Sequence, residues 1–273
     1  MRMSRFGLAT AALAATACLS APAFADGLYG GPVRDAPVVM SSPGHCYIRG
    51  DVGYSWSRDP DVKWTVTDPD PASSTFGQFV TDSVTNVNIG NAWLVEGGVG
   101  CGSGTRGLRG EIMLGYHGKR SIEGTPGPWT VPPAVDPLHT SVRTTTLMFN
   151  GYYDLGSYRG FVPYLGAGVG LAYNQTGSVS FTGNPALVNV IEGADRWALA
   201  WSLMAGVGYQ ITDRMTLDFG YRYLDMGKAE SGTIDSAGFT NPRVRIDDLA
   251  AHEFKVGIRY SFGGGEPCCA MMK

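Results

Sequence analysis

The sequence has no long apolar run after its first residues. The run at residues 6–19 follows Arg2 and Arg5 and is shorter than the roughly 20 apolar residues that a membrane-spanning helix needs. Residues 23–25 then supply the small-x-small pattern of a signal-peptide cleavage site. We therefore predict a cleaved signal peptide over residues 1–25 and an exported chain without a helical anchor.

Charged residues and histidines are also scarce. Only 16% of the 273 residues are charged and the formal net charge is −3, which excludes the basic surface that nucleic acid requires. The four histidines show neither metal-ligand spacing nor a nucleophile–base–orienter context. The sequence therefore predicts no cofactor, no metal site, no nucleic-acid partner and no enzymatic activity.

Residues 253–262 show what the chain contains in place of apolar runs. Polar or tiny residues alternate there with large apolar ones at every step, so the two kinds lie on opposite faces of a β-strand. Ten residues at roughly 3.3 Å each, tilted by about 40°, span the ~25 Å apolar band of an outer-membrane barrel. This strand indicates a membrane location.

Seven further segments share this alternation, and the connections between the eight are alternately long and short. The long ones are 58–90, 118–141, 174–195 and 227–247, and the short ones are 102–107, 155–159 and 212–214. The segments themselves are 46–56, 93–101, 108–117, 146–153, 161–173, 197–211 and 216–223.

This rhythm predicts an all-β fold over residues 46–262. We expect an eight-stranded antiparallel up-and-down transmembrane β-barrel with short periplasmic turns and long external loops. Residues 26–45 are predicted to be a periplasmic N-terminal linker, and residues 263–273 a flexible C-terminal tail.

Alternation alone does not say which face points inward. A soluble carrier of fatty ligands would turn its apolar face inward. Three features favour the membrane arrangement: aromatic residues at the strand ends, glycine crowded on the polar face, and the alternation of long and short connections.

The polar face carries the only chemical constellation of the chain, five positive and five negative side chains. Eight strands enclose a space just wide enough for side chains to fill, and buried charges are tolerable when they are paired. A neutral plug is the favoured interpretation, and a narrow solute path gated by these charges is the alternative. The ten residues are Arg49, Asp51, Glu96, Arg109, Glu111, Asp218, Arg222, Glu253, Lys255 and Arg259.

Two cysteines fall at the ends of adjacent predicted strands. Cys46 opens the first strand and Cys101 closes the second, so both lie at the periplasmic rim with the same facing. We predict a cross-strand disulfide between them, and two lipid-facing thiols are the alternative.

Four segments carry a resemblance to a known family: YIRGDVGY at 47–54, FVPYLGAGVG at 161–170, GYRYLDMG at 220–227 and FKVGIRYSF at 254–262. They resemble the alphaproteobacterial outer-membrane β-barrel family of opacity-type porins and immunogenic surface proteins, which is similar to the barrel half of the OmpA class. The resemblance implies periplasmic chaperones and insertion by the outer-membrane assembly machinery, with Phe262 as the terminal aromatic signal.

The expected location is the cell outer membrane, and the expected function is that of a non-enzymatic integral barrel with a structural and surface-interaction role. A narrow small-solute channel is the main alternative, and a lipid-modifying barrel enzyme is a weaker one. The expected partners are outer-membrane lipids, lipopolysaccharide, the assembly machinery with its chaperones, and host or environmental ligands at the surface.

Overall fold

The structure is a computed structural model that describes residues 45–68, 71–126, 137–181, 190–233 and 242–262. Every regular element in these ranges is a β-strand, and none of the described residues forms a helix that could span a membrane. The predicted signal peptide at 1–25 and tail at 263–273 lie outside the described residues, as does the predicted linker except for His45.

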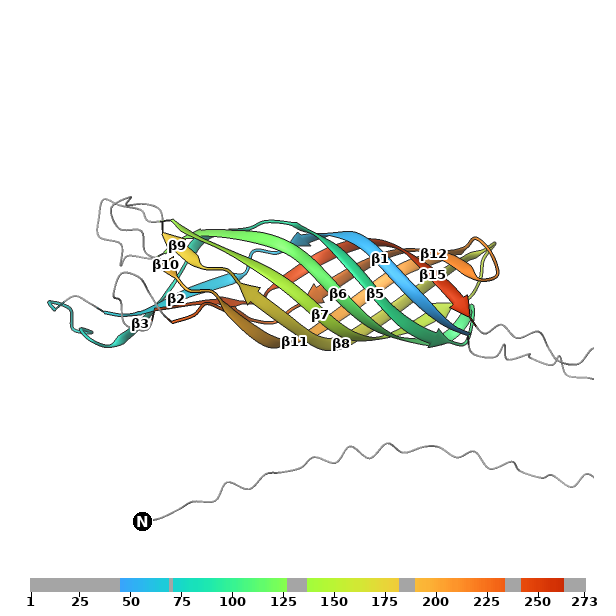
Figure 1. The fold of residues 1–273 in the computed structure, drawn as a ribbon, viewed down its shortest axis with the longest axis horizontal. Helices are drawn as coiled ribbons and strands as arrows, with labels where there is room; N and C mark the ends of the chain where they lie inside the picture. The colour runs from blue at the N-terminus through green and yellow to red at the C-terminus, as the bar shows by residue number, and fades with distance from the viewer. Residues whose placement is uncertain (1–44, 69–70, 127–136, 182–189, 234–241, 263–273) are drawn as a thin grey trace, which may run out of the picture. The chain divides into compact units, whose positions relative to one another are not determined.

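Eight long antiparallel strands form a closed ring (Figure 1). Each pairs with its neighbour in chain order, and the ring closes where β15 pairs with β1, with Val52 opposite Val256. The prediction of an eight-stranded up-and-down barrel is confirmed. The ring consists of β1 His45–Ser57, β5 Ala92–Gly102, β6 Arg106–Thr125, β7 Leu138–Leu155, β8 Phe161–Thr176, β11 Ala194–Gln210, β12 Met215–Asp225 and β15 Ala250–Phe262.

The barrel is inverted relative to a soluble protein. Along β15, Phe254, Val256 and Ile258 are exposed, whereas Glu253 and Lys255 are buried. Large apolar side chains thus point outward, where a bilayer can cover them, and the charges point inward. A soluble carrier with an apolar interior is therefore the wrong interpretation of these strands.

The short turns at 103–105, 156–160 and 211–214 lie at one end of the barrel, together with the start of β1 and the end of β15 (Figure 1). We call this the short-turn end and the opposite one the long-connection end. At the short-turn end the first strand begins at His45, one residue before the predicted start of the barrel.

The long connections contain more structure than the predicted loops. A separate four-stranded sheet has the order β13-β14-β2-β3. The barrel sheet is extended by β4, which pairs with β6, and by β9, which pairs with β7. The short strand β10 pairs in turn with β9. These additional strands are β2 Asp61–Thr67, β3 Phe79–Ser83, β4 Thr85–Ile89, β9 Val179–Phe181, β10 Val190–Ile191, β13 Ala229–Glu230 and β14 Arg243–Asp247.

An apolar core fills the long-connection end. Ile122 of β6, Leu138 of β7, Leu224 of β12 and Ile246 of β14 are all buried in one cluster. The interior therefore changes along the barrel, from charged side chains near the short turns to hydrocarbon near the long connections.

Candidate functional site: the charged lumen

The structure places all ten predicted charged side chains inside the barrel, each no more than 9% exposed. They project from five consecutive strands of the ring, β12, β15, β1, β5 and β6. The remaining wall, β7, β8 and β11, carries mostly small or neutral residues such as Gly168, Asn150 and Ser202. The charges therefore fill the lumen from one side.

Glycines on the lumen face leave room for these side chains. Gly257 of β15 lies opposite Asp51 of β1, and a methyl group at Gly257 would come within 1.8 Å of the Asp51 carboxylate. At Gly168 of β8 the same addition would come within 2.1 Å of the Asn150 side chain. The glycine crowding seen in the sequence thus reflects a filled interior.

Near the short turns, ion pairs run from strand to strand. Nε of Arg109 donates to Asp154 at 3.0 Å, and its Nη1 donates to Glu111 at 2.5 Å. Arg49 then joins Glu111, at 3.0 Å, to Asp51, at 2.9 Å. Each carboxylate here faces at least one guanidinium, the pairing that makes a buried charge tolerable.

Further along the lumen the chain of contacts continues without a break. Nζ of Lys255 lies 3.4 Å from Asp51 and donates to Glu96 at 2.7 Å. Arg222 donates to Glu96 and, at 2.6 Å, to Glu253. A single network therefore connects the two ends of the charged region.

Aromatic rings surround the arginines nearest the short turns. The hydroxyl of Tyr47 donates to Glu111 at 2.6 Å, and the Arg109 guanidinium lies 4.1 Å from the ring centre of Tyr152 and 5.0 Å from that of Tyr164. Stacking on an aromatic face adds a cation–π attraction to the ion pairs. This part of the lumen is packed as well as neutralised.

A branch of the network reaches the mouth of the barrel. Arg259 donates to Asp218 and lies 5.6 Å from the ring centre of Tyr47. A cavity of about 180 Å³ opens at the short-turn end and is lined in part by Tyr47, Arg109 and Arg259. Members of the charge network therefore form the inner wall of this cavity.

Two charged residues of the lumen were missed by the sequence prediction. Asp154 follows directly after the predicted segment 146–153, and Arg120 lies past a register shift between His117 and Arg120 that breaks the strict alternation of β6. Both are buried, at 1% exposed each, and raise the lumen count from five to six of either sign. The charge balance inferred from the sequence is thus preserved.

The outer boundary of the network is a small polar cluster. His117 is hydrogen-bonded through Nε2 to Glu253 at 2.9 Å, and Arg120 donates to the hydroxyl of Ser55 at 3.2 Å. Nη1 of Arg120 also lies 3.5 Å from the sulfur of Met226, which belongs to the apolar core. Hydrocarbon begins where the ion pairs end.

Glu96, His117 and Glu253 bring three potential metal-ligand atoms within 4.8 Å of one another. Both carboxylates already accept hydrogen bonds from Arg222, and Glu96 also accepts one from Lys255. A divalent cation placed among them would meet two fixed positive charges, so this triad fits an ion-pair cluster better than a metal site.

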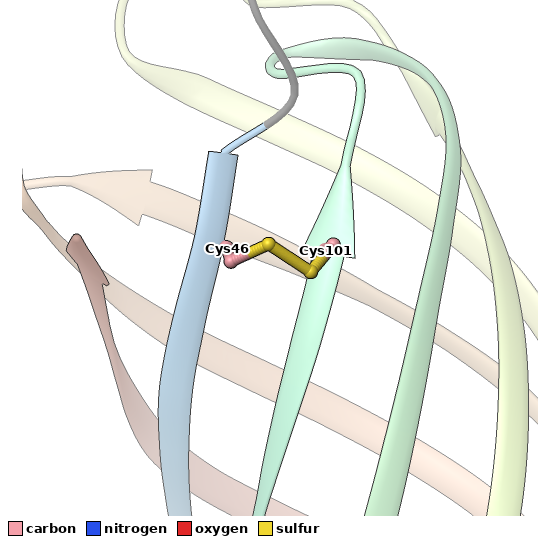
Figure 2. Close-up of a disulfide and its surroundings, with 2 residues drawn as sticks. All are labelled: Cys46 and Cys101. Carbon is pink, nitrogen blue, oxygen red and sulfur yellow. A yellow bond between two sulfur atoms is a disulfide. The ribbon is translucent and has the colours of Figure 1, made fainter. Parts of the chain in front are cut away.

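The two predicted cysteines are joined in the structure (Figure 2). Cys46 of β1 and Cys101 of β5 are register partners, with an S–S distance of 2.09 Å and 4.0 Å between their Cα atoms. Phe262 pairs with Cys46 from the other side and ends β15, and its side chain points outward. Mass measurement of the unreduced protein tests the bond, since free alkylatable thiols at both cysteines would contradict it.

Comparison with known proteins identifies the class of protein. The family described as outer membrane protein beta-barrel domain matches residues 11–262, and the chain belongs to this family. A protein of Brucella suis is 30% identical over 279 aligned positions, which cover 89% of this chain and 94% of that protein. The chain is thus an integral β-barrel of the bacterial outer membrane, with its short turns on the periplasmic side.

Two other relatives match over shorter stretches. The outer membrane protein PagN of Salmonella typhimurium is 37% identical over 136 residues, covering 46% of this chain and 55% of PagN. A putative adhesin of Rickettsia bellii is 29% identical over 119 residues, covering 42% of this chain and 52% of the adhesin.

Among solved structures, OprG from Pseudomonas aeruginosa superposes with a TM-score of 0.46 at 17% identity, covering 81% of this chain and 97% of OprG.

Proposed function

We propose that this protein is a non-enzymatic outer-membrane barrel with a closed interior, which stabilises the envelope and makes contacts at the cell surface through its outer β-structure. The observation that carries the closed interior is the unbroken series of buried contacts from Asp154 to Arg120, followed by an apolar core. Eight strands enclose only enough space for such side chains.

A narrow solute channel is the second candidate, and one observation favours it. The cavity at the periplasmic mouth is lined by the arginines Arg109 and Arg259, which suits an anion entering from that side. A path across the barrel would then require the ion pairs at Arg222 to open and the apolar core to separate.

Planar-bilayer conductance distinguishes the two candidates. We expect no steady current from the wild type, from Arg222→Ala, or from Lys63→Ala, a control in the outer sheet. A steady wild-type current that Glu96→Ala or Arg222→Ala abolishes, and that Lys63→Ala leaves unchanged, would establish a channel and refute the plug.

A lipid-modifying enzyme is disfavoured by the burial of the residues that most resemble a catalytic set. The hydroxyl of Ser55 lies 3.3 Å from Glu253, which is also bonded to His117, but all three side chains are fully buried inside the lumen. A lipid substrate has no approach to them. Equal lipid profiles of membranes with and without the protein are expected, and a modified lipid A that appears only with the protein would overturn this proposal.

The surface contacts are proposed for the outward face of the sheet β13-β14-β2-β3. A groove of about 430 Å³ crosses this face and includes Lys63, Arg243, Arg245 and Glu230. Phe79 of β3 borders it and is 67% exposed, although this sheet lies beyond the barrel's lipid-facing band. An exposed aromatic beside an excess of basic groups suits an acidic partner.

Binding of intact cells to immobilised acidic polysaccharides and matrix proteins tests this surface. Arg243→Glu should weaken binding several-fold, because it reverses one charge of the groove without touching the buried core. Arg214→Glu, in a periplasmic turn, is the matched control and should bind as the wild type does. Equal binding by both variants would remove this sheet from the function.

A further inference from the structure

A histidine lies among the aromatic rings on the lipid-facing side of the barrel. His252 of β15 pairs in register with Trp56 of β1 and with Tyr223 of β12. From Phe262 to His252 the strand advances ten residues, or about 25 Å along the membrane normal at a tilt of about 40°. If Phe262 marks the periplasmic edge of the apolar band, His252 lies at the outer headgroup level.

The neighbours of His252 hold its ring in place. Nδ1 of His252 and the hydroxyl of Tyr221 are hydrogen-bonded at 2.7 Å, and the ring centre of Tyr223 lies 5.4 Å from that of His252. Among the described residues no protein group bonds to Nε2, so this nitrogen remains available to a ligand.

An arginine lies beside the histidine. Arg58 follows β1, and its backbone amide donates to the carbonyl oxygen of Ala250, which fixes this residue next to β15. Its guanidinium donates to the hydroxyl of Tyr223 at 3.3 Å, and it forms no ion pair with any carboxylate in the described part of the chain. Asp225, the next outward residue of β12, accepts the backbone amide of Gly227 at 2.8 Å.

Below these polar groups lies a continuous aromatic wall. The ring centres of Tyr54 and Trp56 are 4.7 Å apart, those of Trp56 and Phe254 are 5.3 Å apart, and those of Phe254 and Tyr221 are 5.3 Å apart. Such a wall suits acyl chains, and the guanidinium of Arg58 with the imidazole of His252 at its outer edge suits an anion at the membrane surface.

We propose that Arg58, His252 and Tyr223 form a binding site for a sugar phosphate of lipopolysaccharide, with the aromatic wall against its acyl chains. Arg58 supplies a charge-assisted hydrogen bond, Nε2 of His252 a second, and the hydroxyl of Tyr223 orients the arginine. The site depends on the outer-membrane location and is independent of whether the lumen conducts.

Native mass spectrometry of the folded protein in detergent tests the site, with diphosphorylated lipid A as the probe. The variant Arg58→Gln/His252→Gln should need at least about tenfold more lipid A for half-occupancy, a loss of ~1.4 kcal/mol. The matched control is Arg143→Gln/His139→Gln, whose two side chains lie on the outward face of β7 and which should bind as the wild type does. Heat-dependent gel migration confirms that each variant is folded.

Two further probes determine what is recognised. Enzymatically dephosphorylated lipid A should bind weakly to every variant, and phosphatidylglycerol should bind the wild type and Arg58→Gln/His252→Gln equally well.

Equal binding of lipid A by the site variant and the control would overturn the proposal. A phosphatidylglycerol affinity that depends on Arg58 and His252 as strongly as that of lipid A would refute lipopolysaccharide as the ligand. If the double variant does not fold, His252→Gln alone is tested, and an unchanged affinity for lipid A would likewise overturn the site.

Discussion

The periplasmic and outer halves of this barrel have opposite interiors, and β6 shows both. In its first half Arg109 and Glu111 point inward and Ile112 points outward; past the register shift, Ile122 points inward and Glu123 outward. The medium outside each half explains the reversal. Where lipid surrounds the strand, its polar side chains can only lie inside the barrel. Where water surrounds the strand, its apolar side chains lie inside.

The comparison also shows what each half needs in order to be stable. The periplasmic half holds buried charges that are tolerable because ion pairs neutralise them, apart from Arg120, which is bonded to the neutral Ser55 and Met226. This half is therefore sensitive to the removal of one member of a pair. The outer half is built like a soluble β-protein, whose fold is stabilised mainly by buried apolar side chains, whereas its surface ion pairs contribute little to stability.

The largest expected difference between the halves appears when one arginine is removed from each of them in turn. Arg222→Ala leaves Glu253 without its guanidinium partner, and Glu96 with Lys255 alone, so we expect a loss of about 3–5 kcal/mol. Arg245→Ala breaks a partly exposed pair with Asp247 and should cost less than about 1 kcal/mol. Urea unfolding in lipid vesicles measures both, and equal losses would show that the lumen charges are not a buried network.

The next comparison removes hydrocarbon from two environments. Ile246→Ala opens space in the outer core and should cost about 2–5 kcal/mol. Leu199→Ala removes a side chain that is 72% exposed on the lipid-facing side of β11 and should cost much less in the same vesicles. An outer sheet that unfolds independently would show instead as a separate transition for Ile246→Ala, with the barrel midpoint unchanged.

The smallest expected effect is the pH dependence of the outer sheet. Burial raises the pKa of Asp247, but the hydrogen bond from Lys228 and the charge of Arg245 outweigh it, and the pKa lies below its usual value. A carboxyl group whose pKa is lowered by folding stabilises the folded state at any pH above its unfolded pKa of about 3.9. This contribution is lost as the pH falls through the pKa of the folded state.

Asp247→Asn should therefore reduce stability by less than about 1 kcal/mol at about pH 7, and the difference should vanish in strong acid. Unfolding midpoints of the wild type and the variant across this pH range provide the measurement. A difference that grows as the pH falls would contradict the assigned direction of the shift.

Much of the periplasmic half could be predicted from the sequence because strict alternation assigns a face to every residue of a strand. This placed Arg49, Glu96 and Lys255 inside without knowledge of their partners. The prediction failed at Arg120 because a register shift breaks the alternation there. It failed at Asp154 because the predicted segment ended at residue 153, although the alternation continues to Leu155 at the end of β7.

The outer sheet was missed for a different reason. Its strands are short, and their apolar residues, such as Val62 and Val244, face inward as in a soluble protein. A search for outward-facing apolar bands of membrane-spanning length cannot find them, and so these regions were predicted as loops.

The amino-acid sequence by itself determined the number of strands in the ring, the face on which ten of the lumen charges lie and the place of the chain in the outer membrane, because all three follow from a two-residue period and the length of the apolar band. Only the tertiary structure decided which carboxylate meets which guanidinium, and where the charged interior gives way to hydrocarbon. Those contacts depend on the register between strands far apart in the chain, such as Arg222 with Glu96, and no local pattern encodes that register.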